Sequence, residues 1–535
     1  MEEQLIEYLE DYYSKVEPLT KKVNISYFDA SISGKEADYE KSAAYQIEIS
    51  KFYSNKEMFN RLKKFKESDE IKNPVLKREL DLIYNEFVGN QFDDKLHEEI
   101  INLSTKIEQK FSTFRAKANG KQLTDNEIDE LLEKSTDSKE LEEIWKASKE
   151  IGKVVADDVI RLVKLRNKGA QELGYENYHE MSLILSEQSS EEIDKLFDEL
   201  DDLTEEGFSK LKDEMDKYLS NKLGIEENEL MPWHYEDKFF QLGPKIYNVD
   251  LDKYYKDKNI AELTKKYFDG INLSINDILE KSDLYEKEGK YQHAYCMDID
   301  RSGDVRVVCN IKPNQKWTST MLHEFGHAVY DKFVSPSLPW QLRSHAHIFT
   351  TEAIAMMFGR LAQNPEWLYK MVGIPEEEKN IIHEECSSSL RLEQLTFNRW
   401  VQVIYRFERE MYSNPDQDLD ELWWKLVEKY QLLKKPEGRN EPDWASKIHV
   451  ALYPAYYHNY LLGELLASQL YLYITTKVLK SDNTKSESFV DKSEVGEYLK
   501  NIFFSYGALY PWNELIAKST GEELTAKYYA EQFIK

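Results

Sequence analysis

The spacing of two histidines near the middle of the chain constrains its fold more than any other feature. Residues 323–327 read His-Glu-Phe-Gly-His, and in a helix two residues four apart lie on one face, a single turn from each other. Phe325, Ala328 and Val329 supply the apolar stripe of a buried helix. We expect the hydroxyl groups of Thr318–Thr320 to cap the start of this helix.

Two imidazoles at this separation can bind one zinc ion, which leaves Glu324 free to act on a water bound to the metal. A third ligand is expected downstream, and Glu352 lies in the first turn of a second apolar helix, behind Thr350–Thr351, which are suited to capping. We therefore predict one zinc ion per chain, bound by His323, His327 and Glu352 with an open coordination position. The alternative is an accidental motif in a solvated helix.

Composition excludes several classes of protein. The chain has 535 residues, of which 41% are hydrophobic, so it can bury a large core as one large helical enzyme or as two or three domains. Its 99 acidic and 71 basic residues give a formal charge of -28. Nucleic acid and anionic membrane surfaces are therefore excluded as partners.

Cysteine content and the N-terminal segment bear on the compartment. Cys296, Cys309 and Cys386 are too few for a disulfide framework and lack paired metal-ligand spacing, so we expect buried thiols. The first residues are acidic and amphipathic, unlike a signal peptide, and no run of about 18 apolar residues occurs. We predict a cytoplasmic protein, or a periplasmic or secreted one if a signal was trimmed.

Helix dominates the pattern along the chain. Residues 1–110 form N-terminal helices that cover a core or act as a lid, with breaks expected at Asn24–Ser26 and Asn73–Pro74. The helices that follow are expected to break at Gly152 and Gly174.

The clearest strand signal lies just before the two histidines. Residues 291–299 and 304–311 alternate around a turn at 301–304, which predicts a hairpin. A strand beside a catalytic zinc ion could pair with an extended peptide, or it could be purely structural. The aromatic turn at 230–237 either lines a pocket or only packs.

A second group of polar side chains gathers between Lys447 and Tyr460. Peptide hydrolysis creates an oxyanion, which a tyrosine hydroxyl or an imidazole can stabilise, and Lys447 is a candidate to bind a substrate carboxylate. The alternative is an aromatic helix start in the core.

These segments together resemble the peptidyl-dipeptidase A family, whose familiar member is angiotensin-converting enzyme, and in particular a bacterial-type member. Residues 292–298, Gln-His-Ala-Tyr-Cys-Met-Asp, are similar to the family's Cys-His-Ala-x-x-x-Asp strand. The resemblance implies that His293 and Ala294 bind the peptide backbone. The 25-position step from His327 to Glu352 also suits this family.

The C-terminal part of the resemblance implies further roles. Residues 447–449, Lys-Ile-His, match the family's Lys-Phe-His, so that Lys447 would hold the substrate's terminal carboxylate and His449 would contact its backbone. Tyr457 and Tyr460 match a Tyr-x-x-Tyr pair, of which the first lies near that carboxylate and the second donates to the oxyanion. One extra residue after His449 leaves Tyr456 as an alternative to Tyr457.

The chain departs from the family at four places. Asn459 stands where vertebrate members have a chloride-binding arginine, and Met356 replaces an acidic residue that orients a zinc histidine. Gln292 replaces a disulfide cysteine, and Trp233–Tyr235 replaces a Trp-Ala-Gln that helps to bind the carboxylate. The related thimet oligopeptidase family has a glycine-rich tyrosine loop, whereas residues 452–455 contain no glycine.

The resemblance implies a mostly α, two-lobed metallopeptidase fold with a deep central channel and a short β-hairpin beside the zinc helix. Residues 1–535 would form one peptidase unit, with the substrate strand and zinc site at 291–360 and the carboxylate and oxyanion segment at 440–475. Short peptides are the expected substrates, without nucleic acid or membrane, and a monomer is favoured.

The expected reaction is zinc-dependent release of C-terminal dipeptides. Glu324 would take a proton from the zinc-bound water and pass it to the leaving amine, while Tyr460 and His449 stabilise the oxyanion. The alternatives are an endo-acting oligopeptidase of the thimet type and a non-catalytic, zinc-stabilised peptide-binding module.

Overall fold

The structure, a computed structural model, describes residues 1–247 and 249–534. Helix makes up 69% of it, and the described residues contain two small hairpins. The predicted mostly α fold is thus confirmed. The chain forms two compact units. The first comprises Met1–Gln91, Val249–Cys386 and Leu462–Gln532, and the second comprises Phe92–Asn248, Ser387–Leu461 and Phe533–Lys535. Among the described residues, no helix is long and apolar enough to cross a membrane.

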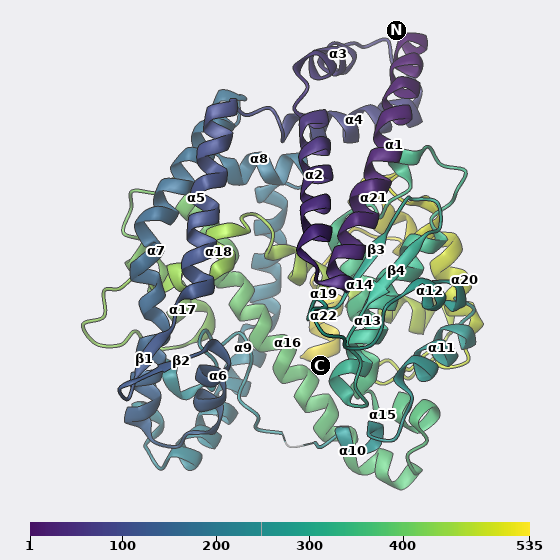
Figure 1. Ribbon diagram of the computed structural model, residues 1–535. Coiled ribbons are helices and arrows are strands. Elements are labelled where there is room, and N and C mark those ends of the chain that lie inside the picture. The colour runs from purple at the N-terminus through teal and green to yellow at the C-terminus, as the bar shows by residue number, and fades with distance from the viewer. Residues whose placement is uncertain (248, 535) are drawn as a thin grey trace. The chain divides into compact units, whose positions relative to one another are not determined.

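The first unit contains the N-terminal helices and the predicted zinc helix (Figure 1). Its helices and strands are α1 (Glu2–Ser33), α2 (Glu36–Tyr53), α3 (Lys56–Lys66), α4 (Pro74–Val88), α10 (Asp252–Tyr255), α11 (Ile260–Gly270), α12 (Asn276–Lys281), β3 (Tyr295–Asp298), β4 (Val305–Val308), α13 (Gln315–Phe333), α14 (Ile348–Gly359), α15 (Pro365–Trp367), α20 (Ser493–Tyr498) and α21 (Trp512–Thr520).

The second unit consists mainly of long helices with one short hairpin. Its elements are α5 (Asp94–Thr113), β1 (Ala116–Ala118), β2 (Lys121–Leu123), α6 (Asp125–Lys134), α7 (Ser138–Glu172), α8 (Tyr178–Leu185), α9 (Ser190–Leu223), α17 (Leu419–Gln431) and α18 (Ile448–Leu452). The chain passes between the units within α16 (Glu376–Ser413), α19 (His458–Tyr473) and α22 (Lys527–Phe533).

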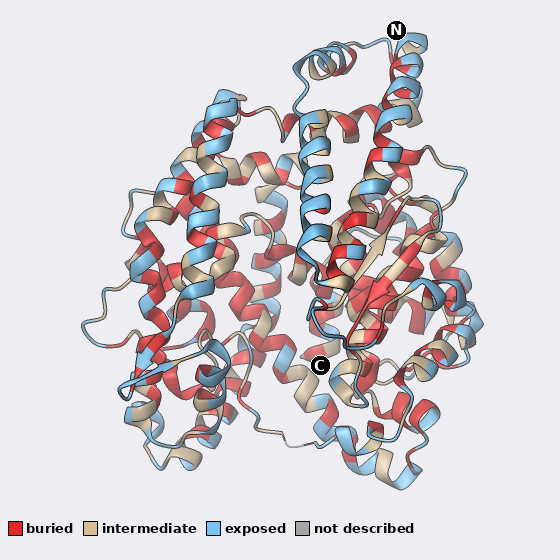
Figure 2. Ribbon diagram, viewed as in Figure 1, coloured by how far each residue is buried: buried red, intermediate tan, exposed pale blue. Residues whose placement is uncertain are grey.

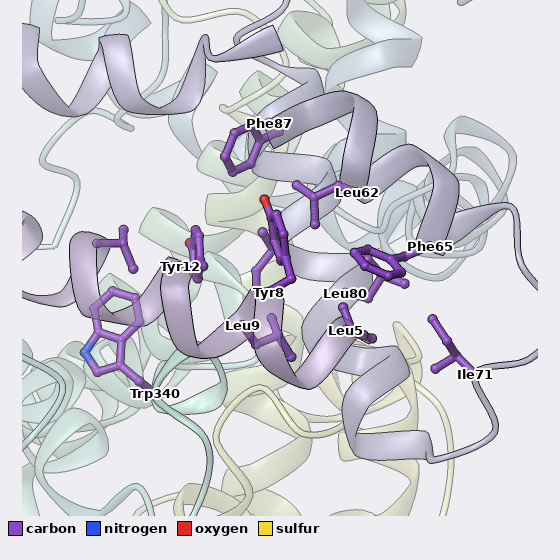
Figure 3. Packing of buried hydrophobic residues seen from close by; sticks show 12 residues of the cluster. Leu5, Tyr8, Leu9, Tyr12, Leu62, Phe65, Ile71, Leu80, Phe87 and Trp340 are labelled. Carbon is purple, nitrogen blue, oxygen red and sulfur yellow. The ribbon is translucent and has the colours of Figure 1, made fainter. Parts of the chain in front are cut away.

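The N-terminal helices share a hydrophobic cluster with Trp340. Leu5, Tyr8, Leu9 and Tyr12 of α1 lie in this cluster beside side chains of α3 and α4 (Figure 3). Helix α2, in contrast, has Ser42 as its one buried residue and is exposed along most of its length (Figure 2).

Helix α1 runs through the break expected at residues 24–26, so that prediction was wrong. The side-chain amide of Asn24 donates to the carbonyl oxygens of Asp298 and Ile299, at 3.1 and 3.2 Å. An asparagine that favours a turn locally is here used in a contact with the end of β3, and the helix continues.

Of the other predicted helix breaks, two are present and one is not. Asn73 caps α4 by accepting from Val75 and Leu76, and Gly174 follows the end of α7 with φ 92°, so both of these were correct. Gly152 instead lies within α7, so the break predicted there was wrong. A Cβ at this position would stand 2.3 Å from the carbonyl oxygen of Pro442. A close backbone approach, not a break, requires this glycine.

The hairpin before the zinc helix is present but shorter than predicted. Strands β3 and β4 are antiparallel, with Tyr295 opposite Val308 and Asp298 opposite Val305, and both lie beside α13 (Figure 1). A second hairpin, β1–β2, was not predicted from the sequence.

The capping prediction for α13 was wrong, and that for α14 was correct in part, because Thr350 accepts from the backbone N–H of His347 at 3.2 Å. Helix α13 is capped by Asn314, which accepts from the N–H of Trp317 at 2.8 Å. Helix α14 is capped by His347, which accepts from Phe349 at 3.2 Å, and Glu352 therefore lies in the second turn. Both helices therefore begin before the predicted hydroxyls, at the local caps Asn314 and His347.

Helices α13 and α14 cross in direct backbone contact at Gly326. A Cβ at this position would lie 2.8 Å from Cα of Ala355 and 3.2 Å from its nitrogen. At Gly359 an added Cβ would meet Cβ of His323 at 3.4 Å, an ordinary van der Waals contact. The glycine within the His-Glu-Phe-Gly-His sequence thus allows the two helices to meet.

We predict that Gly326→Ala destabilises the protein by roughly 1–3 kcal/mol and weakens zinc binding, because neither backbone can yield without moving a helix. Gly359→Ala is the matched control, and we expect it to be tolerated, since alanine favours the helix and its Cβ has room. Urea unfolding of both metal-free variants measures the difference. Equal unfolding free energies for the two variants would contradict the crossing argument.

Candidate active site

The predicted metal ligands converge in the first unit. The Nε2 atoms of His323 and His327 lie 3.3 Å apart, and Oε2 of Glu352 lies 3.7 and 3.9 Å from them. The histidines come from successive turns of α13 and the carboxylate comes from α14, so the Gly326 crossing brings the three together.

This donor set fits a zinc ion. Ligands at roughly 2.0–2.1 Å from a tetrahedral zinc ion lie about 3.4 Å from one another. The three separations of 3.3, 3.7 and 3.9 Å are therefore within about 0.5 Å of what coordination requires. Two imidazoles and one carboxylate are also the ligand types found in catalytic zinc sites.

Burial keeps both imidazoles neutral. Desolvation lowers the pKa of His323 to about 4, and it lowers the pKa of His327 well below its usual value, assisted by His323 and His345. Each ring therefore retains a nitrogen lone pair for a metal at neutral pH.

The two carboxyl groups of the site are shifted in the opposite direction. Desolvation, with the nearby charge of Glu352, raises the pKa of Glu324 to about 8. Desolvation also raises the pKa of Glu352 to about 7, and Glu464 adds to that effect. A bound divalent cation would favour the ionised form of both groups.

Thr351 orients one of the histidines. Its Oγ1 lies 2.7 Å from Nδ1 of His327. When Nε2 of His327 faces the other two ligands, Nδ1 carries the proton and donates to this hydroxyl, which fixes the tautomer. The sequence indicated only a capping role for Thr351 and left open what replaces the acidic residue at Met356. The signal that could have predicted the role of Thr351 is its hydroxyl, which lies next to the ligand Glu352 in the sequence.

A cavity of about 280 Å³ adjoins the three ligands. Ala294 lines it, together with Cys296, whose backbone N–H donates to the carboxylate of Glu324. His293 is exposed and packs on Tyr291 at a ring distance of 5.4 Å, outside this lining. The structure thus brings Ala294, but not the His293 side chain, to the cavity.

The second unit contains the other predicted site residues, beginning with Lys447. Its Nζ donates to Oε1 of Gln241 at 2.7 Å and lies 5.3–5.7 Å from the ring centres of Phe239, Trp400 and Tyr457. Desolvation lowers the pKa of Lys447 to about 8. Among the described residues, no carboxylate forms an ion pair with this lysine.

The tyrosines near Lys447 differ in position. Tyr457 is buried, and its hydroxyl accepts from Nε1 of Trp400 at 3.0 Å. Tyr456 packs instead against Tyr460, at a ring distance of 5.5 Å. The structure therefore places Tyr457 beside Lys447. The ring of His449 lies 5.1 Å from that of Tyr457, and burial lowers its pKa to about 4.

The residue that contacts Lys447, Gln241, lies outside the aromatic turn at 230–237. In the segment 233–235, His234 bonds Ser138 at 2.8 Å and Tyr235 donates to Asp216 at 2.7 Å, so both are held within the fold. Gln241 contacts the lysine, and nothing in the sequence indicated this contact beyond the proximity of Gln241 to that turn. At Asn459, the side-chain oxygen accepts from Gln188 at 2.8 Å.

Lys447 and His449 open onto a cavity of about 540 Å³ in the second unit. Its wall combines aromatic rings with charged groups, and Asp129 is ion-paired with Lys238 at 3.0 Å. A cavity of this size can hold one or two amino-acid side chains.

The helical fold, with two histidines and a glutamate around a candidate zinc position, indicates that the chain is a metallopeptidase. The family model of peptidase family M3 matches residues 131–534, and the chain belongs to this family. The model described as angiotensin-converting enzyme matches residues 1–235, which confirms the resemblance drawn from the sequence. Both families are zinc-dependent.

Individual relatives agree with this assignment. The chain is 26% identical to thermostable carboxypeptidase 1 of Pyrococcus furiosus, over 39% of this chain and 45% of that protein. It is 25% identical to angiotensin-converting enzyme of Haematobia irritans exigua, over 55% and 47% respectively. An inactive angiotensin-converting enzyme-related protein of Caenorhabditis elegans is 21% identical over 52% and 30%. The matches span half or less of these relatives' lengths.

We predict that Thr351→Val lowers zinc affinity by roughly 10–100-fold, because His327 loses the acceptor that fixes its tautomer. Competition with a chelating dye measures this affinity without reference to activity. Thr351→Ser keeps the hydroxyl and should bind zinc like the unaltered protein. Unchanged affinity in the valine variant would show that Thr351 does not orient the ligand.

Proposed function

We propose that this protein is a zinc-dependent peptidase that shortens peptides from the carboxyl end, two residues at a time. The observation that carries this function is the convergence of His323, His327 and Glu352 beside the buried carboxylate of Glu324. A structural zinc site has no use for a base next to its ligands. Membership of a peptidase family supports the same activity.

His323, His327 and Glu352 would hold the zinc ion, which supplies Lewis-acid polarisation of the scissile carbonyl and of the attacking water. Glu324 accepts the proton of that water and delivers it to the leaving amine. The backbone N–H of Cys296 lowers the pKa of this carboxyl and so favours its ionised form. Ala294 immediately precedes strand β3, which pairs with β4 alone among the described residues, and we assign Ala294 and its neighbour His293 to the peptide backbone.

The residues of the second unit serve the carboxyl end and the oxyanion. Lys447 binds the terminal carboxylate together with Tyr457 and Gln241, since none of the described carboxylates forms an ion pair with it. Tyr460 and His449 donate to the oxyanion as the carbonyl is attacked. The large cavity beside Lys447 accepts the side chain of the last residue.

The names of two relatives favour other functions. The name of the Pyrococcus relative specifies a carboxypeptidase, which raises single-residue release as an alternative. The nematode relative is described as inactive, which raises a zinc-stabilised peptide-binding module. An endo-acting oligopeptidase is the third alternative, and it would not need a carboxylate-binding lysine.

Mass spectrometry of a mixed-length peptide library, incubated with zinc-loaded protein, distinguishes these cases. We expect products that lack two C-terminal residues and depend on Glu324, so that Glu324→Gln loses roughly a hundredfold or more of the rate while still binding zinc. Single-residue losses would indicate a carboxypeptidase, and internal cuts an oligopeptidase. If fully metallated protein cleaves no peptide, the result would favour the non-catalytic peptide-binding module.

The carboxylate role of Lys447 predicts a pH dependence. Its ammonium is charged below a pKa of about 8 and becomes neutral above it. For N-acetylated peptides with a free carboxylate, kcat/KM should therefore fall above pH 8 by about tenfold per pH unit, because this quantity reports the free enzyme. Lys447→Met should have low kcat/KM at every pH and lack this decline. A decline that persists in the variant would assign it to another group.

A further inference from the structure

The turn between α18 and α19 carries the proposed carboxylate-binding tyrosine, but its own backbone stabilises it poorly. Ala455 within it adopts φ 53°, a left-handed conformation that alanine disfavours. The nearest backbone hydrogen bonds start before and after it, from Tyr453 to His449 and from Asn459 to Tyr456. Something outside the turn must hold Ala455 in this conformation.

Glu408, on α16, provides one such contact. Its side chain is 2% exposed, and Oε2 accepts from the backbone N–H of Ala455 at 2.9 Å. Among the described residues, no lysine or arginine forms an ion pair with this carboxylate. Two ionisable groups lie near it: His179, whose Nε2 is 3.9 Å away, and Arg166, whose charge interacts with this carboxylate from outside ion-pair distance. A buried carboxylate without an ion pair is costly, so its contact with the turn needs an explanation.

Arg166, on α7, holds the other side of the same turn. Its guanidinium, also buried, donates to the carbonyl oxygen of Ala451 at 3.1 Å and to the hydroxyl of Tyr412 at 3.0 Å. Ala451 lies in the last turn of α18, where a carbonyl lacks a partner within the helix. A buried cation and a buried anion therefore bind the backbone at both sides of residues 452–454.

We propose that Glu408 and Arg166 are positioning residues, which hold residues 451–455 so that Tyr457 lies beside Lys447. Neither side chain lines the cavity next to Lys447, so each acts through the backbone of the turn. This inference rests on the proposed function, because that function assigns Tyr457 and Lys447 to the carboxylate of the substrate. The contacts of Glu408 and Arg166 with the turn stand independently of it.

The first test needs no variant. Ala455 lies in neither a helix nor a strand, and its N–H would exchange rapidly with solvent if Glu408 did not bind it. Hydrogen exchange followed by fragmentation to single-residue resolution should show this amide protected. Rapid exchange in the unaltered protein would overturn the proposal, whether or not the protein cleaves peptides.

The second test compares variants of α16. Glu408→Leu removes the acceptor, Glu408→Gln keeps an amide oxygen that can accept, and Glu410→Leu is a control at an exposed position of the same helix. We expect Glu408→Leu to speed exchange at Ala455 and to raise KM for peptides with a free carboxylate by roughly ten- to a hundredfold. Glu408→Gln should recover most of both properties, and Glu410→Leu should change neither.

The outcomes separate the alternatives. If Glu408→Leu lowers only the melting temperature and leaves exchange at Ala455 and KM unchanged in the folded protein, the carboxylate is merely structural and the proposal fails. If Glu408→Leu does not fold, the Glu408→Leu/Ala455→Gly double variant replaces it, since glycine adopts a positive φ freely and should restore folding. The KM of the double variant must still be raised, and a normal KM would contradict positioning by Glu408. If the amide of Ala455 is protected but the unaltered protein cleaves no peptide, the contact with Glu408 is supported and the proposed peptidase function is rejected.

Discussion

The crossing of α13 and α14 at Gly326 is the contact on which the metal site depends. Because an added Cβ would stand 2.8 Å from Cα of Ala355, the helix axes approach as closely as two backbones allow. Gly463 repeats this arrangement on α19, where an added Cβ would lie 3.1 Å from Cβ of Glu352. Positions fixed by backbone contact leave little freedom to the ligands. The site is therefore preorganised by the fold rather than assembled by flexible side chains.

Close packing also sets the charge states of the site. The helices that hold Glu352 and Glu324 exclude water from them, and the pKa values of both rise toward neutrality for that reason. The same burial lowers the pKa of His323 and His327. Two neutral imidazoles and two carboxyl groups form a cluster that a divalent cation stabilises more than protons do. Metal binding should thus contribute to the folding free energy of the first unit.

The sequence predicted what depends on local spacing. The pair at 323 and 327, the hairpin before it and the breaks at Asn73–Pro74 and Gly174 follow from periodicity and turn chemistry. The same reasoning failed where a distant segment decides the outcome. Asn24 binds the end of β3 instead of ending a helix, and Gln241 meets Lys447 across 206 positions of sequence. Such contacts require the folded backbone, which a single sequence does not supply.

Two buried lysines that lie against one aromatic ring differ in the size of the cavity beside them. Lys149 and Lys447 lie 3.4 and 5.3 Å from the ring centre of Phe239, and desolvation lowers the pKa of both, to about 7 and about 8. Lys149 faces a cavity of about 20 Å³, which holds no more than a water molecule. Lys447 faces about 540 Å³. By contrast, the buried Lys212 is paired with Asp216 at 2.7 Å. Of these three lysines, only Lys447 combines the lack of an ion pair among the described residues with a cavity large enough for an anion.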